Sequence, residues 1–390
     1  MKQARVTALA LGAVVCVMAV SAASAVAQTT NRAPRITSAA ATPVAGYGTP
    51  LNVTFSAVAT DQDFDALTYS WNFGDGTTST AQNPTHAYQQ FGFYNATLTV
   101  SDGRGGTATR TIQVNVLSTE RDPDARFRIL VFSKTAAFRH SSIDEGVTAI
   151  RKLGAENDFQ VDASEEASLF TDANLALYDA VVFLSTTGDV LNAEQQAAFE
   201  RYIQAGGGYV GIHAASDTEY TWKWYGDLVG AYFRGHPAQQ TASIDIEDAD
   251  DHSTLGLPER WTRFDEWYDF KPVNFEQTGN IDYSPRGQVH VLATLDESTY
   301  SGEATGTTDH PISWCQRYDG GRSWYTALGH TEASYLEPAF LSHILGGIEV
   351  AAGVATSKAC GRKGWHGTNP KNRDGNLADN NNGAGDDRRR

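Results

Sequence analysis

The sequence predicts an all-β sandwich followed by an α/β domain whose sheet is doubly wound and largely parallel. Its 390 residues are enough for two hydrophobic cores. From residue 33 to 117, short segments alternate apolar and polar residues between turn clusters such as "GDGTTS" and "DGRGG", which is typical of half-buried strands. From residue 127 to 355, continuous apolar runs alternate with helical segments, which indicates strands buried on both faces and helices that cover them.

Residues 1–27 have the features of a secretory signal. Lys2 and Arg5 precede the apolar run "VTALALGAVVCVMAVSA", and "SAVA" provides a small-residue cleavage site. A membrane anchor is the alternative, but the run is short and Ala-rich. We therefore expect a secreted, extracellular protein with no integral membrane segment after cleavage. Loss of the two cations changes the net charge from −16 to −18, and such an acidic surface argues against nucleic acid as a partner.

Three carboxylates stand at alternate positions in the first domain. Asp61, Asp63 and Asp65 lie in "ATDQDFDALTY", in a loop between two expected strands. Closely spaced carboxylates in a loop suit Ca²⁺, which takes several oxygen ligands. The alternative is a solvated turn in an acidic protein, and the sequence leaves both open.

The segment "YSWNFGDGTTSTAQNPTHAYQQFGFYNATLTVSDGRGG" closely resembles a PKD domain, including its Trp-x-Phe-Gly-Asp-Gly core and the His-x-Tyr that follows. The resemblance implies an immunoglobulin-like sandwich over residues 33–117. Such modules are usually non-catalytic spacers or weak binders attached to secreted enzymes that degrade polysaccharides or proteins. A charged, proline-containing linker follows at residues 118–126.

The second domain begins with a strand–helix alternation. Strands are expected at 127–133, 178–186 and 208–215, and helices at 141–157, 192–207 and 221–233. Asn192 and Gln195 have capping-box spacing, which predicts the start of the second helix. Later strands follow closely at 241–248, 262–270, 289–296, 312–318 and 323–329, which indicates an antiparallel extension before a final helix at 338–353. The tail, 356–390, lacks apolar periodicity and is expected to be disordered.

The mature chain keeps two cysteines, Cys315 and Cys360. In an oxidising compartment they could form a disulfide, and two buried free thiols are the alternative.

Candidate site residues follow several expected strands. In open α/β sheets, ligands bind beyond the carboxyl ends of the strands. The candidates are His140 after the first strand, His213 and Asp217 after the third, His236 after the next helix, Glu266 in "FDEWYDF" and His330 after "SWYTALG". Trp222 and Tyr225 could form an aromatic platform for a sugar, although their helical spacing equally fits core packing.

The second domain resembles the ThuA-like (trehalose utilisation) family. The resemblance rests on "FRHSSI", "GGGYVGIHAASDT", "WYGDLVGAYFRGHP", "FDEWYDF" and "HPISWCQRYDGGRSWYTALGHTEASY". It implies a three-layer, flavodoxin-like fold of the class I glutamine amidotransferase type and a link to carbohydrate utilisation. It does not imply one settled reaction.

The amidotransferase relatives carry a cysteine nucleophile at the strand-to-helix elbow and a His-x-Glu pair after a late strand. Here His330-Thr331-Glu332 resembles that pair, but the elbow carries His213. Without a thiolate at this position the acyl-enzyme route lacks its nucleophile. We therefore expect no glutamine amidotransferase activity.

Three possibilities remain open for this histidine- and carboxylate-rich pocket: a metal site, acid–base catalysis without metal, and binding without turnover. His213, His330 and Glu266 would suit a divalent metal. Without metal, His213 and His330 could act as acid and base, with Glu266 and Glu332 as partner carboxylates and His140, Asp217 and His236 as substrate-binding groups. The leading hypothesis is an enzyme that hydrolyses, eliminates or isomerises a sugar derivative from a mono-, di- or polysaccharide. The alternatives are a non-catalytic carbohydrate-binding or adhesion protein and a structural surface protein.

Overall fold

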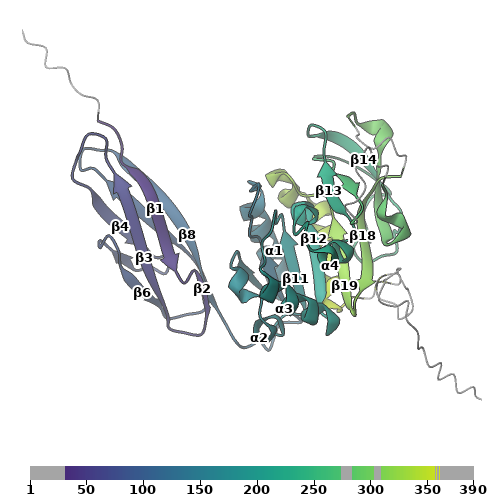
Figure 1. The fold of residues 1–390 in the computed structure, drawn as a ribbon, viewed down its shortest axis with the longest axis horizontal. Helices are drawn as coiled ribbons and strands as arrows, with labels where there is room; N and C mark the ends of the chain where they lie inside the picture. The colour runs from purple at the N-terminus through teal and green to yellow at the C-terminus, as the bar shows by residue number, and fades with distance from the viewer. Residues whose placement is uncertain (1–30, 274–282, 303–308, 356, 358–359, 361–390) are drawn as a thin grey trace, which may run out of the picture.

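The computed structural model describes residues 31–273, 283–302, 309–355, 357 and 360. They form a β-sandwich and an α/β domain, which lie side by side and are joined by the segment after strand β8 (Figure 1). The predicted signal and most of the predicted tail fall outside the described residues. Among the helices in the described ranges, none combines the length and the apolar character needed to cross a membrane.

The first domain contains two sheets, as expected. One has the strand order β1-β3-β6 and the other β2-β8-β7-β4-β5. The strands are β1 (Arg35–Thr42), β2 (Ala45–Tyr47), β3 (Leu51–Thr60), β4 (Thr68–Asn72), β5 (Thr78–Ser79), β6 (Thr85–Tyr88), β7 (Gly92–Ser101) and β8 (Thr107–Leu117). Alternate residues of β3, among them Val53 and Phe55, are buried, and they pack with Trp71 of β4 and Leu98 of β7. The period-two pattern therefore sets the face that each strand turns to the core.

The second domain is built on a nine-stranded mixed sheet of order β10-β9-β11-β12-β19-β18-β17-β14-β15. The strands are β9 (Arg128–Phe132), β10 (Gln160–Ser164), β11 (Ala180–Leu184), β12 (Gly208–Ile212), β14 (Gln240–Ile246), β15 (Arg260–Asp265), β17 (His290–Asp296), β18 (Pro311–Tyr318) and β19 (Gly321–Thr326). The first five in spatial order are parallel, and from β19 to β15 each neighbour is antiparallel. The expected antiparallel extension is confirmed.

Helices cover both faces of this sheet. They are α1 (Ile143–Glu156), α2 (Asp172–Leu175), α3 (Ala193–Gln204), α4 (Lys223–Val229) and α5 (Pro338–Ala352). Gly208 of β12 lies against the backbone of α5, whereas the next residue, Tyr209, contacts α3 through Phe199 and α4 through Tyr225. Successive residues of a strand point to opposite faces. The domain therefore has the three layers that the sequence predicts.

Several elements of the second domain differ from expectation. Strands β10 and β13 (Tyr232–Gly235) and the short helix α2 were not anticipated, and the single strand expected at 262–270 is divided into β15 and β16 (Asp269–Lys271). Helix α4 ends earlier than the periodicity predicts, because Gly230 adopts a left-handed φ of 99° and the following residues enter β13. The Asn192–Gln195 capping box at α3 is confirmed, with both of its hydrogen bonds present.

The two domains meet at β10, an edge strand of the large sheet. The Asn115 side chain of β8 donates to the carbonyl of Ala163 in β10. The hydroxyl of Tyr47 lies 3.2 Å from that of Tyr178, which donates to the buried carboxylate of Asp162. The guanidinium of Arg128 completes this group with an ion pair to Asp162. Buried, hydrogen-bonded side chains therefore link the domains across the junction.

Replacing Tyr47 by Phe and Asn115 by Ala together should loosen the junction. The double variant loses two interdomain hydrogen bonds, which we expect to weaken docking by about 1–3 kcal/mol. Small-angle X-ray scattering should then record a larger radius of gyration than for wild type. Thr109→Ala, at an exposed position of β8, is the control. Identical scattering from the double variant and wild type contradicts the prediction.

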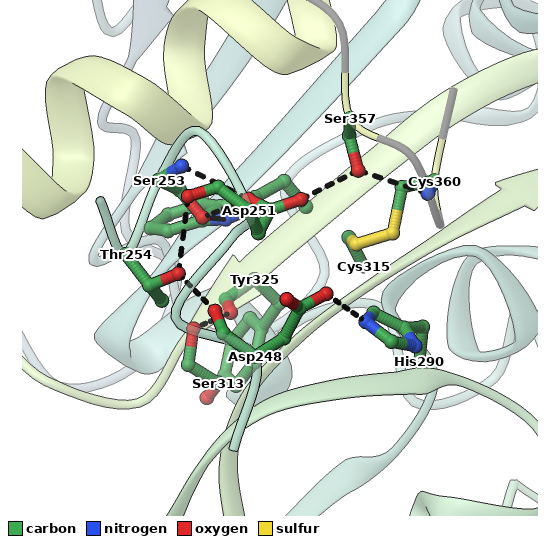
Figure 2. Close-up of a disulfide and its surroundings, with 11 residues drawn as sticks. Asp248, Asp251, Ser253, Thr254, His290, Ser313, Cys315, Tyr325, Ser357 and Cys360 are labelled. Carbon is green, nitrogen blue, oxygen red and sulfur yellow. Dashed lines mark hydrogen bonds and ion pairs between the residues drawn. A yellow bond between two sulfur atoms is a disulfide. The ribbon is translucent and has the colours of Figure 1, made fainter. Parts of the chain in front are cut away.

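A disulfide joins Cys315 of β18 to Cys360, with a Cα–Cα distance of 5.8 Å, so the alternative of free thiols is wrong (Figure 2). Both cysteines are buried. Nearby, the Ser357 hydroxyl donates to Asp251 and accepts from the backbone N–H of Cys360. Ser357 and Cys360, the described residues of the predicted tail, are thus held by side-chain contacts to the second domain.

The Cys315→Ala/Cys360→Ala variant should be less stable than wild type. The disulfide closes a loop across a separation of 45 residues. In the chain-entropy model, such a crosslink stabilises the folded state by about 4 kcal/mol. Urea unfolding followed by tryptophan fluorescence measures this difference, and addition of reductant to wild type should reproduce it. An unchanged unfolding midpoint in both experiments rules the prediction out.

Candidate functional site

Four side chains converge at the carboxyl edge of the large sheet. They are His140 after β9, His213 after β12, Glu266 after β15 and His330 after β19, and one potential ligand atom from each lies within 4.8 Å of all the others. His140, His213 and Glu266 are buried, and His330 is half-buried. We call this group the histidine cluster. The sequence proposed His213, His330 and Glu266 as ligands, and the structure adds His140 beside them.

His213 stands at the elbow where β12 turns into the 3-10 helix η2 (His213–Asp217). Its φ of 53° is in the left-handed region, which a residue with a Cβ adopts only at a cost of about 1–3 kcal/mol. The ring Nδ1 lies 2.7 Å from the Ala327 carbonyl oxygen, which can only accept a hydrogen bond. Nδ1 therefore donates to this carbonyl, and Nε2 faces His330 and Glu266.

The curvature of the sheet brings Glu266 to this elbow. Strand β15 is four strands from β19 in hydrogen-bonding order, a separation of about 19 Å in a flat sheet. Yet the carboxylate of Asp265, the last residue of β15, accepts hydrogen bonds from the backbone N–H groups of Gly329 and His330. The antiparallel half therefore curves until the ends of β15 and β19 meet.

Asp265 fixes the backbone around two members of the cluster. It is fully buried, and besides the N–H groups of Gly329 and His330 it accepts the N–H of Glu266. Arg263 neutralises it, with Nη2 at 3.2 Å from Oδ2. A buried carboxylate needs such pairing, because an isolated charge is strongly disfavoured in the protein interior.

The charges in the cluster differ from one residue to the next. Burial alone would raise the pKa of Glu266, but hydrogen bonds and charge from His213 and His330 outweigh burial and hold that pKa well below its usual range. Burial, with the neighbouring histidines, lowers the pKa of His140 to about 3, so its ring is neutral near pH 7. Burial would lower the pKa of His330, but Glu266 at 3.0 Å raises it overall.

Two further side chains contact the exposed side of the cluster. The Gln239 amide lies 2.6 Å from His330 Nε2. The Gln239 amide N–H donates to His330 Nε2, and His330 Nδ1, which faces Glu266, then carries the ring proton. His236 lies at the exposed rim of the cluster, with its Nδ1 3.2 Å from Glu266 Oε1. The substrate-binding role expected for His236 stays a prediction.

This donor set fits a divalent transition metal. Three imidazoles and one carboxylate are ligands that such ions prefer. His213 donates its other ring N–H to a backbone carbonyl, as metal-ligating histidines do. Nδ1 of His140 is buried without a hydrogen-bond partner among the described residues, so a polar atom beside the cluster lacks an interaction.

Asp217 and Glu332 lie outside the cluster. The Asp217 carboxylate accepts a hydrogen bond from Tyr220, and burial raises its pKa. Glu332 is exposed and accepts a hydrogen bond from Ser141 that lowers its pKa. The His-x-Glu resemblance therefore matches the sequence spacing, but the Glu332 carboxylate is turned toward Ser141.

The expected aromatic platform is corrected. Tyr225 is 0 % exposed and bonds to the Tyr209 hydroxyl and the Ala215 carbonyl, so it cannot present a face to a ligand. Trp222 is half-buried, stacks on Trp224 and donates its indole N–H to Glu200 of α3. The helical spacing of these residues reflects core packing, which was the alternative.

Sequence reasoning missed Asp265, Gln239 and Tyr268. Tyr268 is buried, with its ring centroid 4.4 Å from that of His213. Burial raises the pKa of its hydroxyl well above the usual value, so the ring is a neutral wall of the site. Adjacency to Glu266 in "FDEWYDF" was the available signal for Asp265 and Tyr268, whereas Gln239 had none.

Asp61, Asp63 and Asp65 form a second group with ligand atoms within 4.8 Å of one another. The Oδ2 atoms of Asp61 and Asp65 are buried and have no hydrogen-bond partner among the described residues. Arg104 lies 2.9 Å from Asp65 Oδ1 and supplies one positive charge. The loop thus brings the three carboxylates together as the calcium hypothesis requires.

The comparisons with known proteins agree with both domains. The PKD domain model matches residues 31–116. Collagenase ColA of Bacillus cereus is 49 % identical over 57 residues, which are 15 % of this chain and 6 % of that protein. A microbial collagenase of Vibrio alginolyticus is 41 % identical over 69 residues, 17 % of this chain and 8 % of that protein. The chain therefore spans less than a tenth of these relatives.

A ThuA-like protein of Bacteroides uniformis of known structure is 22 % identical, with a TM-score of 0.50, and the alignment covers 59 % of this chain and 93 % of that one. At this identity the likeness shows the fold alone. The model of the ThuA family, described as trehalose utilisation, matches residues 128–351, more than half of the chain. The chain therefore belongs to the ThuA family and carries a PKD domain before its ThuA domain.

Proposed function

We propose that this protein is an exported carbohydrate-active enzyme whose ThuA domain binds a divalent transition metal at the histidine cluster and acts on a sugar or glycoside. The observation that carries the proposal is the convergence of His140, His213, Glu266 and His330, from four strand ends, within 4.8 Å. The family description, trehalose utilisation, supports a carbohydrate as substrate. The signal-like residues 1–27 and the disulfide support export.

A metal at this site would polarise a sugar oxygen and lower the pKa of a bound water. The chain's own residues would then orient the reactants. Asp265 holds the His330 and Glu266 backbones, and the Ala327 carbonyl holds the His213 tautomer. His236, half-exposed beside Glu266, is within reach of a proton on a substrate at the rim. Tyr268 covers one side of His213 and excludes water from it.

Metal content and turnover should both depend on His213. Purified wild type should carry about one transition metal per chain by plasma mass spectrometry, and His213→Ala should lose it. Loss of an outer-shell partner weakens metal binding about 10–100-fold, and loss of a ligand should weaken it at least that much. Trehalose and a panel of oligosaccharides, followed by chromatography, should yield a product with wild type and none with the variant.

His290→Ala, a histidine paired with Asp248 outside the cluster, is the matched control and should keep both properties. Metal-free wild type would exclude the metal model. Metal-loaded wild type that binds sugar without forming product would favour the alternative, a carbohydrate-binding or adhesion protein.

We also propose that the loop of Asp61, Asp63 and Asp65 binds calcium and stiffens the PKD domain. The supporting observation is the pair of buried, unpartnered Oδ2 atoms of Asp61 and Asp65. A PKD domain held this way would serve as a spacer or weak binder for the ThuA domain.

Calcium should raise the thermal midpoint of the wild-type chain. Mass action predicts about 2.7 kcal/mol of stabilisation at a calcium concentration 100 times the dissociation constant. Asp61→Asn should abolish the effect in differential scanning calorimetry, whereas Asp124→Asn, in the exposed linker, should preserve it. A thermal midpoint of wild type that is the same in calcium and in chelator refutes the site.

A further inference from the structure

We propose that Phe138 is the platform on which a sugar ring stacks at the entrance to the histidine cluster. This inference rests on the proposed carbohydrate function and identifies a binding residue for it. Phe138 lies in the segment between β9 and α1, two positions before His140, and its side chain is 64 % exposed. Exposed apolar side chains are common singly, so position and geometry carry the argument.

The ring of Phe138 contacts the cluster directly. Its centroid lies 4.9 Å from that of His140, and the two planes meet at 86°. In such an edge-to-face pair, one ring presents its edge to the other's face. Whichever ring does so, at least one face of Phe138 is left uncovered by His140. His140 itself is buried against His213 and His330, so Phe138 marks the solvent side of the cluster.

The backbone that carries Phe138 is fixed. Its carbonyl accepts a hydrogen bond from the Thr187 hydroxyl, and Ala136 donates its N–H to the Thr187 carbonyl, both at 2.7 Å. Thr135 and Thr187 also form an isolated parallel bridge. The segment is therefore tied to the end of β11, and ordering it adds little entropic cost to binding.

The surroundings of Phe138 match the chemistry of a pyranose. One face of such a ring displays C–H groups, which favour an aromatic surface, while its hydroxyls require polar partners. The chain supplies exposed polar groups near His140 in the Ser141–Glu332 pair, and His236 at the rim of the cluster. The buried Tyr225 and half-buried Trp222 cannot supply the exposed ring, whereas Phe138 does.

The test measures glycan binding and metal content on the same full-length samples. A glycan array identifies the glycans that wild type binds, and titration of the best one gives its affinity. Phe138→Ala should lower that affinity about tenfold. That is the effect of losing roughly 50 Å² of buried apolar contact. Phe138→Tyr, which keeps the ring, should bind like wild type. Metal content should be the same in all variants, because Phe138 has no ligand atom.

Phe91 of the PKD domain is also largely exposed, at 52 %. Phe91→Ala is therefore the control and should bind like wild type. Equal affinity of Phe138→Ala and wild type overturns the platform and leaves the metal site standing. Glycan binding that is lost in Phe91→Ala instead moves the binding surface to the PKD domain and also overturns the platform. A wild type that binds no glycan overturns the platform together with the carbohydrate function, whatever its metal content.

Discussion

The buried carboxylate of Asp265 is the interaction on which the rest of the candidate site depends. It accepts the N–H groups of Glu266, Gly329 and His330, and so joins the end of β15 to the end of β19. The ion pair with Arg263 offsets the free-energy cost of burying the Asp265 charge. Without this link, the curvature of the antiparallel half would have no fixed end point, and Glu266 would not meet two histidines from the parallel half. The histidine cluster is thus a product of sheet curvature as much as of strand order.

Much of the fold could be predicted because its signals are local. The Asn192 capping box and the apolar runs of β9, β11 and β12 each carry a period that can be read from a few residues. Strand β10 was missed because "QVDAS" is short and includes Asp162, whose burial depends on a distant partner, Arg128. The hydrophobic periodicity of β9 and of β10 does not indicate the Arg128–Asp162 ion pair.

The candidate site was predictable to the extent that strand ends share an edge. His213 and His330 follow neighbouring parallel strands, β12 and β19, so their proximity follows from topology. Glu266 met them only through the curved sheet, and its inclusion rested on residue type and family resemblance. The sequence left Trp222 and Tyr225 open between a sugar platform and core packing, because a helical period does not show whether a neighbouring element covers the apolar face. The same limit hid Phe138, whose exposure depends on which elements leave it uncovered.

The junction at β10 has a consequence for the chain's behaviour toward its own copies. An edge strand offers unpaired backbone groups to any passing strand, and proteins commonly cover or charge such edges. Here the PKD domain lies over this edge, and the Asn115 side chain donates a hydrogen bond to the Ala163 carbonyl. Proteolytic removal of the PKD domain would leave the histidine cluster in place but expose the β10 edge, where a strand of a second copy could pair. By covering this edge, the PKD domain therefore also limits strand pairing between copies of the chain.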